Sequence, residues 1–493
     1  MKTTDFFVKG IFVLLSMVLM LTACDSDKET PILPEEEGPA QENDIDVGTI
    51  ATLNIDDVGV TTATFTISLK AEGDDLPEQI VVYYVNYENQ DFPDTGMSYV
   101  CEYPIAFFEK TGSVTSTITD LEPNTKHYYR MSLVYDSKQT HGDIKDFTTL
   151  PDPYKEEMNM DVSSGKDLST SATANCYMVS ESGTYKFKAT KGNSSESVGD
   201  VAKCVLLWES VWEGEGSTLD RTRPGELIKG VCYDNGYIAF NISDIEHGGN
   251  AVIAVKDKSD KILWSWHIWV TDRPQEHTYP NGAGILMDRN LGATSAVPGD
   301  PKAAGLLYQW GRKDPFLGEY DRMTVSISWP GGMNSSSNGT IEYATANPTT
   351  FLLANKANND WLYTGDSSYD ITRWLPSDKP KTIYDPCPAG WRVPDGGENG
   401  VWAKSGYSTT GGYEYDTKGR TFNIASPATT WYPAAGYLRS YYGTLDKVGT
   451  VGCYWSASQD KYSAYYFHIS GGNSFLVFDI HNSLGHSVRC AKE

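Results

Sequence analysis

Short runs in which apolar and polar residues alternate recur in the first hundred or so residues after position 48. Ala63–Leu69, Ile80–Val85 and Ser113–Ile118 have this period of two, with β-branched and aromatic residues at the apolar positions and turn residues between the runs. Such alternation is typical of β-strands that bury one face. About one hundred residues of strands of this kind predict a β-sandwich over residues 48–150.

The alternation returns after a linker that begins at Pro151, and it predicts a second, immunoglobulin-like sandwich over residues 155–273. Its strongest run is Ile262–Val270, with the letters ILWSWHIWV. The other alternating runs are Thr184–Ala189, Ala202–Trp208, Tyr237–Ile242 and Asn250–Val255.

The run ILWSWHIWV carries large side chains on both faces of its strand. Successive side chains of a strand point to opposite sides, so Trp264, Trp266 and Ile268 share one face. His267 and Trp269 share the other face. We expect one face to be core and the other to be covered by a neighbouring domain, because large exposed aromatic side chains are a liability without a partner. A binding surface on the second face is the alternative.

Residues 275–493 have a different composition, rich in Gly, Ser, Asn and Tyr and poor in helix formers. One modest helix is predicted at Ala303–Trp310, after Pro301, and the rest is expected to form short strands and long ordered loops. Long loops inside a compact domain are usually functional or pinned by side chains. The predicted fold class is therefore mostly β: two immunoglobulin- or fibronectin-like β-sandwiches followed by an α+β domain, after a disordered N-terminal tether.

The start of the chain resembles a bacterial export signal. Two lysines precede the apolar run Ile11–Leu21, which is too short for a permanent membrane helix. The letters LTAC that follow resemble the lipobox of bacterial lipoproteins, in which the cysteine receives a lipid. We therefore expect a signal peptide over residues 1–23 and attachment to a membrane through lipid on Cys24. An ordinary secretory signal is the alternative.

The predicted tether, residues 24–47, contains nine acidic residues and three prolines. A stretch of this composition has little to bury and stays extended. Its beginning, Asp25–Glu29, resembles the acidic signal that sends lipoproteins of gut-type Bacteroidetes to the outer face of the cell. We expect a lipid-anchored protein of the outer membrane, exposed on the cell surface. A spacer that faces the periplasm is the alternative.

The net charge, the cysteines and the absence of catalytic motifs limit which partners and reactions we expect. A formal charge of -25 argues against nucleic acid and anionic membrane surfaces as partners. Seven cysteines remain after Cys24, so at least one is unpaired or pairs between chains, and no CxxC or Cys/His cluster indicates zinc. The sequence has no HExxH, no GxSxG, no P-loop and no dinucleotide-binding turn. No catalysis, cofactor or metal is therefore expected, and the oligomeric state stays open.

The first sandwich carries a family resemblance. Leu121–Arg130 (LEPNTKHYYR) resembles the late-strand motif of fibronectin type III domains, and Phe147–Leu150 fits their last strand. The family usually has a tyrosine two residues after the threonine of the motif, and its hydroxyl bonds back to the corner. This chain has His127 there, so the corner bond is either made by the imidazole or lost. The resemblance implies a spacer or a protein-binding module.

Residues 275–493 contain five motifs in a fixed order: Met287–Thr294 (MDRNLGAT), Gly305–Phe316 (GLLYQWGRKDPF), Tyr384–Pro394 (YDPCPAGWRVP), Gly452–Ser458 (GCYWSAS) and His486–Cys490 (HSVRC). In this order they resemble the Fibrobacter succinogenes major paralogous domain of surface lipoproteins and fimbrial proteins. That family resembles the C-type-lectin-like fold and is related in shape to formylglycine-generating enzymes. The resemblance implies a disulfide between Cys387 and Cys490, with Cys453 as a candidate for the odd thiol.

The motifs also hold four arginines and three tryptophans. We interpret the arginines as internal pins of the loops, for instance through Asp288, Asp314 and Asp385, and a carboxylate clamp for a ligand is the alternative. The tryptophans are expected in the core. The residues concerned are Arg289, Arg312, Arg392, Arg489, Trp310, Trp391 and Trp455.

Candidates for ligand contact lie between the motifs. Aromatic faces stack on sugar rings, and flanking polar groups bond hydroxyls, so a glycan platform is one interpretation and a self-packed tyrosine loop is the other. The candidate residues are Trp361, Tyr363, Trp374, Tyr441 and Tyr442.

We expect a non-catalytic surface lipoprotein that acts in adhesion, or binds a glycan or a host or envelope protein, through its C-terminal head. A fimbria-like assembly is one setting for this role. Two alternatives stay open: a purely structural envelope subunit, and an enzyme related to formylglycine-generating enzymes, which rely on nearby cysteines. Calcium-dependent lectin binding is unsupported, since the lone Glu-Pro-Asn motif, Glu122–Asn124, belongs to a turn of the fibronectin-like segment.

Overall fold

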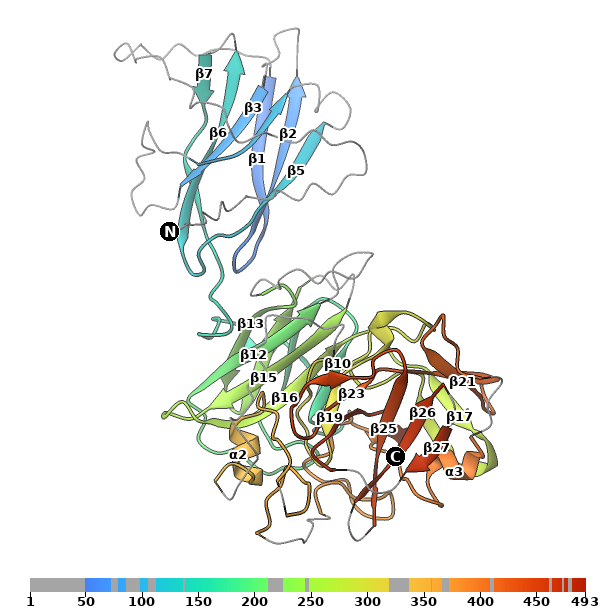
Figure 1. The fold of residues 1–493 in the computed structure, drawn as a ribbon. Coiled ribbons are helices and arrows are strands. Elements are labelled where there is room, and N and C mark those ends of the chain that lie inside the picture. Colours follow the sequence, from blue (N-terminus) through green and yellow to red (C-terminus); the bar gives the residue numbers. More distant parts are fainter. Residues whose placement is uncertain are drawn as a thin grey trace, which may run out of the picture. The chain divides into compact units, whose positions relative to one another are not determined.

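The structure is a computed structural model that divides into two compact units, Met1–Leu150 and Pro151–Glu493 (Figure 1). The predicted signal peptide, Cys24 and the predicted tether lie outside the described residues. Among the residues that are described, no helix is both long and apolar enough to cross a bilayer. The described residues are 49–71, 79–85, 98–104, 112–135, 138–211, 225–243, 248–318, 337–355, 357–365, 372–407, 412–460, 463–471, 474–477 and 481–493.

The N-terminal unit is a β-sandwich of two antiparallel sheets, as predicted. Apolar residues of the runs Ala63–Leu69 and Ser113–Ile118 face inward, and Leu53, Phe65, Ile67, Tyr129 and Phe147 belong to the core between the sheets. One sheet has the order β1 (Thr49–Val58), β2 (Ala63–Ala71), β5 (Ser113–Ile118). The other has the order β4 (Ser98–Pro104), β3 (Gln79–Val85), β6 (Lys126–Tyr135), β7 (Lys138–His141), and β8 (Lys145–Thr148) also pairs with β6.

His127 does not close the corner of this sandwich. Its ring is buried and stacks on Phe147 with the ring centroids 5.1 Å apart, and neither ring nitrogen has a hydrogen-bond partner among the described residues. Thr149 makes the closure instead. Its hydroxyl donates to the carbonyl of Glu122 at 2.6 Å and accepts the N–H of Thr125 at 3.0 Å. The corner bond has moved to a residue that the sequence pattern did not single out.

The C-terminal unit begins with a second sandwich, whose core includes Phe187, Phe240, Ile253 and Trp266. Its strands follow the predicted alternating runs. One sheet has the order β10 (Cys176–Val179), β16 (Ile262–Val270), β15 (Gly249–Lys256), β12 (Lys203–Val211). The other has the order β13 (Ile228–Asp234), β14 (Tyr237–Ile242), β11 (Gly183–Lys188), β9 (Lys166–Asp167), with the 3-10 turn η2 (Val162–Ser164) nearby.

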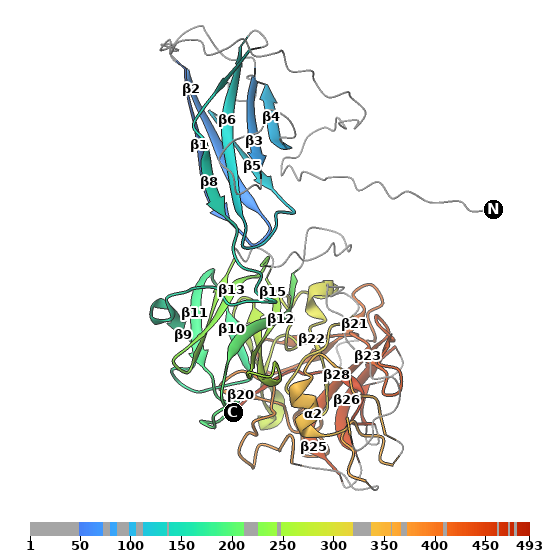
Figure 2. The ribbon, with the colours of Figure 1, turned by 90° about the vertical axis from the view of Figure 1, so that its left-hand side faces the viewer.

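The rest of the C-terminal unit consists of short strands joined by long loops (Figure 2). A small sheet has the order β17 (Glu276–Tyr279), β18 (Gly284–Met287), β29 (Ala491–Lys492), β20 (Trp391–Arg392). The larger sheet has the order β24 (Leu445–Asp446), β23 (Tyr437–Leu438), β28 (Gly485–Ser487), β25 (Val451–Gln459), β26 (Ala464–Ser470), β27 (Ser474–Val477), and β19 (Leu307–Gln309) pairs with β28. The remaining elements are the hairpin β21 (Gly419–Asn423) and β22 (Thr429–Pro433), the helices α2 (Ile341–Ala346) and α3 (Val401–Ser405), and the 3-10 turns η3 (Pro280–Gly282) and η4 (Pro301–Ala303).

The prediction of a helix at Ala303–Trp310 is wrong. Only the turn η4 forms, and Gly305 then adopts a φ of +68°, a left-handed conformation that ends a helix. The next residues pair with β28, Leu307 opposite Ser487 and Gln309 opposite Gly485. Tertiary strand pairing therefore overrides the local helical pattern.

Both faces of β16 are buried, as the alternation predicted. Trp264, Trp266 and Ile268 lie in the sandwich core. On the other face Trp269 packs in a cluster with Leu291 and other residues of the C-terminal segment, and its indole N–H donates to the carbonyl of Ala293 at 3.1 Å. The second face is therefore covered, and the sandwich and the C-terminal segment form one unit.

Cys387 and Cys490 form a disulfide across a sequence separation of 103, as the family resemblance implied. The bond joins the loop before β20 to the segment before β29, and both cysteines are fully buried. Cys176, Cys204, Cys232 and Cys453 are free thiols. The side chain of Cys101 lies outside the described residues.

Removing the disulfide should destabilise the C-terminal unit by about 4–5 kcal/mol, because the bond closes a loop of roughly 100 residues in the unfolded chain. The double variant Cys387→Ser/Cys490→Ser tests this in guanidinium unfolding followed by tryptophan fluorescence, since the first tryptophan of the chain is Trp208. Cys232→Ser is the matched control. An unchanged midpoint in the double variant would contradict a structural role for the bond.

Burial lowers the pKa of His127 below its usual value. The folded state then binds fewer protons than the unfolded state just below pH 6.5, so the stability of the N-terminal unit should be full above about pH 6.5 and fall as the pH drops below it. His127→Phe keeps the ring stack and should remove this slope. Thermal melts between pH 7.5 and about 5, followed by circular dichroism, measure it, and equal slopes in both proteins would refute the assignment.

Candidate functional site

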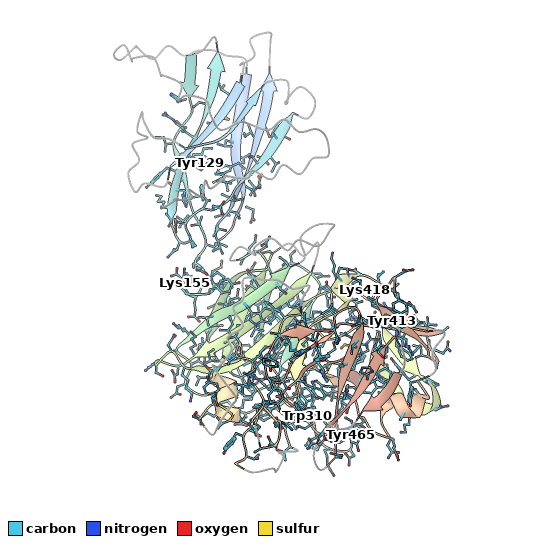
Figure 3. All side chains as sticks on the ribbon, viewed as in Figure 1. Tyr129, Lys155, Trp310, Tyr413, Lys418 and Tyr465 are labelled. Carbon is cyan, nitrogen blue, oxygen red and sulfur yellow. A yellow bond between two sulfur atoms is a disulfide. The ribbon has the colours of Figure 1, made fainter. Side chains whose placement is uncertain are left out.

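Two of the predicted ligand-contact residues lie in the core. Trp361 and Trp374 are 2% and 0% exposed, so neither ring face is open to a ligand, and the prediction is wrong for both. The indole of Trp361 donates to the carbonyl of Trp310 at 2.7 Å, and that of Trp374 donates to the carbonyl of Tyr384 at 2.8 Å. Trp310, labelled in Figure 3, packs against Trp374 with the ring centroids 5.7 Å apart.

A buried ion pair fixes the loop that carries Trp361. The guanidinium of Arg373 binds the carboxylate of Asp360 with both terminal nitrogens, and Nη1 donates to Oδ1 at 3.1 Å. Both side chains are almost fully buried. Arg373 also lies over the ring of Trp361, 4.8 Å from its centroid, and Asn482 donates to Asp360 at 3.2 Å. This group of side chains holds three separate segments of the chain together.

The four motif arginines bond to groups within the protein, as predicted. Most of their partners are carbonyl and amide oxygens rather than the predicted aspartates. Arg289 does pair with Asp288. Arg392 donates to the carbonyls of Leu375, Pro376 and Lys379, and Arg489 donates to Asn290 and to the carbonyl of Trp431. Arg312 donates to Gln309 and to the carbonyl of Thr350. Asp385 accepts backbone N–H groups of Cys387 and Val393, and Asp314 pairs with Lys313.

The loop before Trp361 is folded around one buried side chain, Asn355. Its amide oxygen accepts the backbone N–H groups of Ala357 and Asn358 at 2.8 and 3.1 Å. Its amide nitrogen donates to the carbonyls of Asp360 and Leu362. These local bonds set the loop independently of strand pairing, and they leave Asn359 partly exposed at its tip with a φ of +57°.

The hairpin β23–β24 presents its tip beside this loop. The hydroxyl of Tyr441 donates to Oδ1 of Asn359 at 2.5 Å, and its ring meets the edge of His481 at 5.2 Å. Ser440 bonds Nδ1 of His481 at 2.8 Å, and its carbonyl accepts the N–H of Ala354. Three segments distant in sequence therefore meet at one place on the surface.

We call Asn359, Tyr441, Tyr442 and His481 the tyrosine surface. Tyr442 is 66% exposed, and the other three are partly exposed. Tyr363, the remaining predicted residue, is half-buried, and its N–H donates to the carbonyl of Gly339 in another segment. The sequence thus located the loop of Asn359 and the two tyrosines of this surface but missed His481, because the neighbours of His481 come from other segments.

The side chains of the tyrosine surface can make the contacts that a bound ligand needs. Its aromatic face, phenol hydroxyl, amide and imidazole can stack on a flat apolar face and exchange hydrogen bonds. In the part of the chain that the structure describes, no group of three or more His, Cys, Asp or Glu side chains is arranged to hold a metal ion. Cys453 is buried, and burial raises the pKa of its thiol, so it lacks the character of a reactive thiolate.

No protein-family model and no curated protein matches the chain. Similar solved structures include the sensor domain of the anti-sigma factor RsgI4 from Pseudobacteroides cellulosolvens, with 15% identity, a TM-score of 0.17 and coverage of 21% of this chain and 96% of that one. The fibronectin type III domain of human contactin 1 has 10% identity, a TM-score of 0.16 and coverage of 23% and 84%. That of the human collagen alpha-1(XX) chain has 15% identity, a TM-score of 0.17 and coverage of 25% and 99%. Each likeness concerns a quarter of this chain or less and carries no inference about the tyrosine surface.

Asp360→Asn should destabilise the C-terminal unit by about 3–5 kcal/mol, because it leaves the buried guanidinium of Arg373 without its counter-charge. Asp446→Asn removes the more exposed pair with Arg439 and should cost only a small fraction of that. Urea unfolding followed by tryptophan fluorescence compares the two variants. Equal losses would show that burial does not set the strength of these pairs.

Proposed function

We propose that this protein is a non-catalytic binding protein that is held outside the cell by lipid on Cys24 and contacts a glycan or a protein through its tyrosine surface. The tyrosine surface itself is the observation that supports a binding role. It combines an exposed aromatic residue, Tyr442, with polar groups that do not have to be ordered on binding. The signal-like N-terminus and the acidic stretch after Cys24 support display on the outer membrane.

The tyrosine surface is already ordered before any ligand arrives. Asn355 fixes the loop under Asn359, and the hydrogen bond from Tyr441 fixes the hairpin against it. A preformed surface loses little conformational freedom on binding, which favours affinity. Tyrosine contributes large contact area with few rotatable bonds and is enriched at sites that dominate binding energy.

The test is a glycan and host-protein array probed with the chain from Asp25 to Glu493, with and without calcium. Tyr442→Ala should weaken binding at least about tenfold, as expected for an interface residue that dominates affinity. The matched control is Tyr415→Ala, because Tyr415 is 77% exposed on a different loop and lies outside the tyrosine surface. Thermal melts establish that both variants fold.

The outcomes distinguish a ligand-binding protein from a purely structural envelope subunit. Binding that Tyr442→Ala weakens and Tyr415→Ala leaves unchanged supports the proposal. A folded chain that binds nothing on the arrays, and that is crosslinked on cells to envelope proteins equally well with either variant, favours a structural subunit. Equal weakening by both variants would place the ligand elsewhere on the protein.

A further inference from the structure

A small cavity lies where the segment after β19 meets helix α2. About 10 Å³ is free in it for the centre of a water-sized particle. Its lining is unusually rich in cations, with Arg312, Lys313 and Arg373 facing the same space as Asp314. Ala344 of α2 and the rings of Trp361 and Tyr384 complete the wall. The cavity is separate from the tyrosine surface and from the disulfide.

Two of the three cations have a counter-charge of their own. The ammonium of Lys313 lies 2.6 Å from Oδ1 of Asp314, and Arg373 is bound to Asp360. Arg312 has no carboxylate within ion-pair distance among the described residues, although its side chain is nearly fully buried. When Asp360 is counted with the lining, the three cations exceed the two paired acids by one positive charge, that of Arg312.

The contacts of Arg312, a lining residue of the cavity, leave one of its donors without a partner. Nη1 donates to Gln309 and to the carbonyl of Thr350, while Nη2 lies 3.3–3.4 Å from carbonyls at the end of α2. The guanidinium faces are near the rings of Phe316 and Trp361, 5.1 and 5.7 Å from the centroids. Nε is buried and has no hydrogen-bond partner within the described ranges.

A buried cation with only neutral acceptors is costly. Burial lowers the pKa of Arg312 to about 10, which still leaves it charged at neutral pH. Neutral oxygens accept from its terminal N–H groups but do not cancel its charge, and a low-dielectric interior screens that charge poorly. The same surroundings strengthen any attraction to an anion placed at Nε.

We propose that this cavity is a binding site for a small monovalent anion, of the size of a halide, held by Nε of Arg312. The charge of the lining sets the sign of the ligand, and the volume limits it to one or a few atoms. A sugar or a peptide carboxylate with its attached chain is too large for the space. Trp361 and Tyr384 form part of the wall of this space.

Bromide is the probe, because its anomalous scattering locates it in a crystal of the chain from Asp25 to Glu493. In solution, the melting temperature in bromide is compared with that in gluconate at equal ionic strength, since gluconate does not fit the cavity. We expect an anomalous peak within hydrogen-bond distance of Nε. We also expect a melting temperature about 2–4 °C higher in bromide once its concentration exceeds the Kd roughly tenfold.

Arg312 also holds the chain at Gln309 and Thr350, so the proposal is tested with a cavity-filling variant that keeps this side chain. Ala344→Val adds volume inside the cavity without removing a charge and should abolish the bromide-specific shift. Ala346→Val, on the same helix but outside the lining, is the control and should retain it.

Three results would overturn the proposal. The first is a water at Nε that bromide does not replace. The second is a carboxylate of this chain seated at Nε, which would make the charge balance internal. The third is a bromide peak in the crystal with no difference between bromide and gluconate in solution, which would mean binding at crystal concentration only.

Discussion

The C-terminal unit depends on a strand that has no solvent face. One side of β16 places Trp264 and Trp266 in the sandwich core, and the other side places Trp269 against the segment that follows. Polar bonds reinforce the second contact: Asn250 donates to the carbonyl of Gly292 at 2.9 Å. Both layers pack on this one strand, and the core cluster of the second layer includes Trp208, Val252 and Trp269 of the sandwich. The sandwich and the segment that follows it therefore form one compact unit, Pro151–Glu493.

Strands could be predicted from the sequence because a period of two is a local signal, and β2, β3, β5 and β16 lie where alternation placed them. The candidate site was harder to predict. Trp361 and Tyr442 both stand in polar, tyrosine-rich stretches, yet one is in the core and the other is exposed. Trp361 differs from Tyr442 in that Arg312 and Arg373 lie over its indole ring. Contacts of this kind join distant segments and leave no pattern along the chain.

In the long loops of the C-terminal unit, charged and amide side chains form hydrogen bonds with backbone groups that strand pairing would otherwise satisfy. Long loops have carbonyl groups without strand partners, and buried side chains supply donors for them. Arg392 satisfies three carbonyls, Lys381 satisfies three more, and Asn355 organises a whole turn. Arg312 is a further example: it donates to neutral oxygens of Gln309 and Thr350, and its positive charge therefore stays in the interior.

The pairing of β28 and β29 has a consequence for biosynthesis. Ser487 pairs with Leu307 and Ala491 with Leu286, partners that are roughly two hundred residues earlier in the chain. A polypeptide that is synthesised from its N-terminus must keep its early strands without these partners until β28 and β29 have been made. The two sheets can therefore close only late in synthesis, and the bond between Cys387 and Cys490 forms no earlier than that.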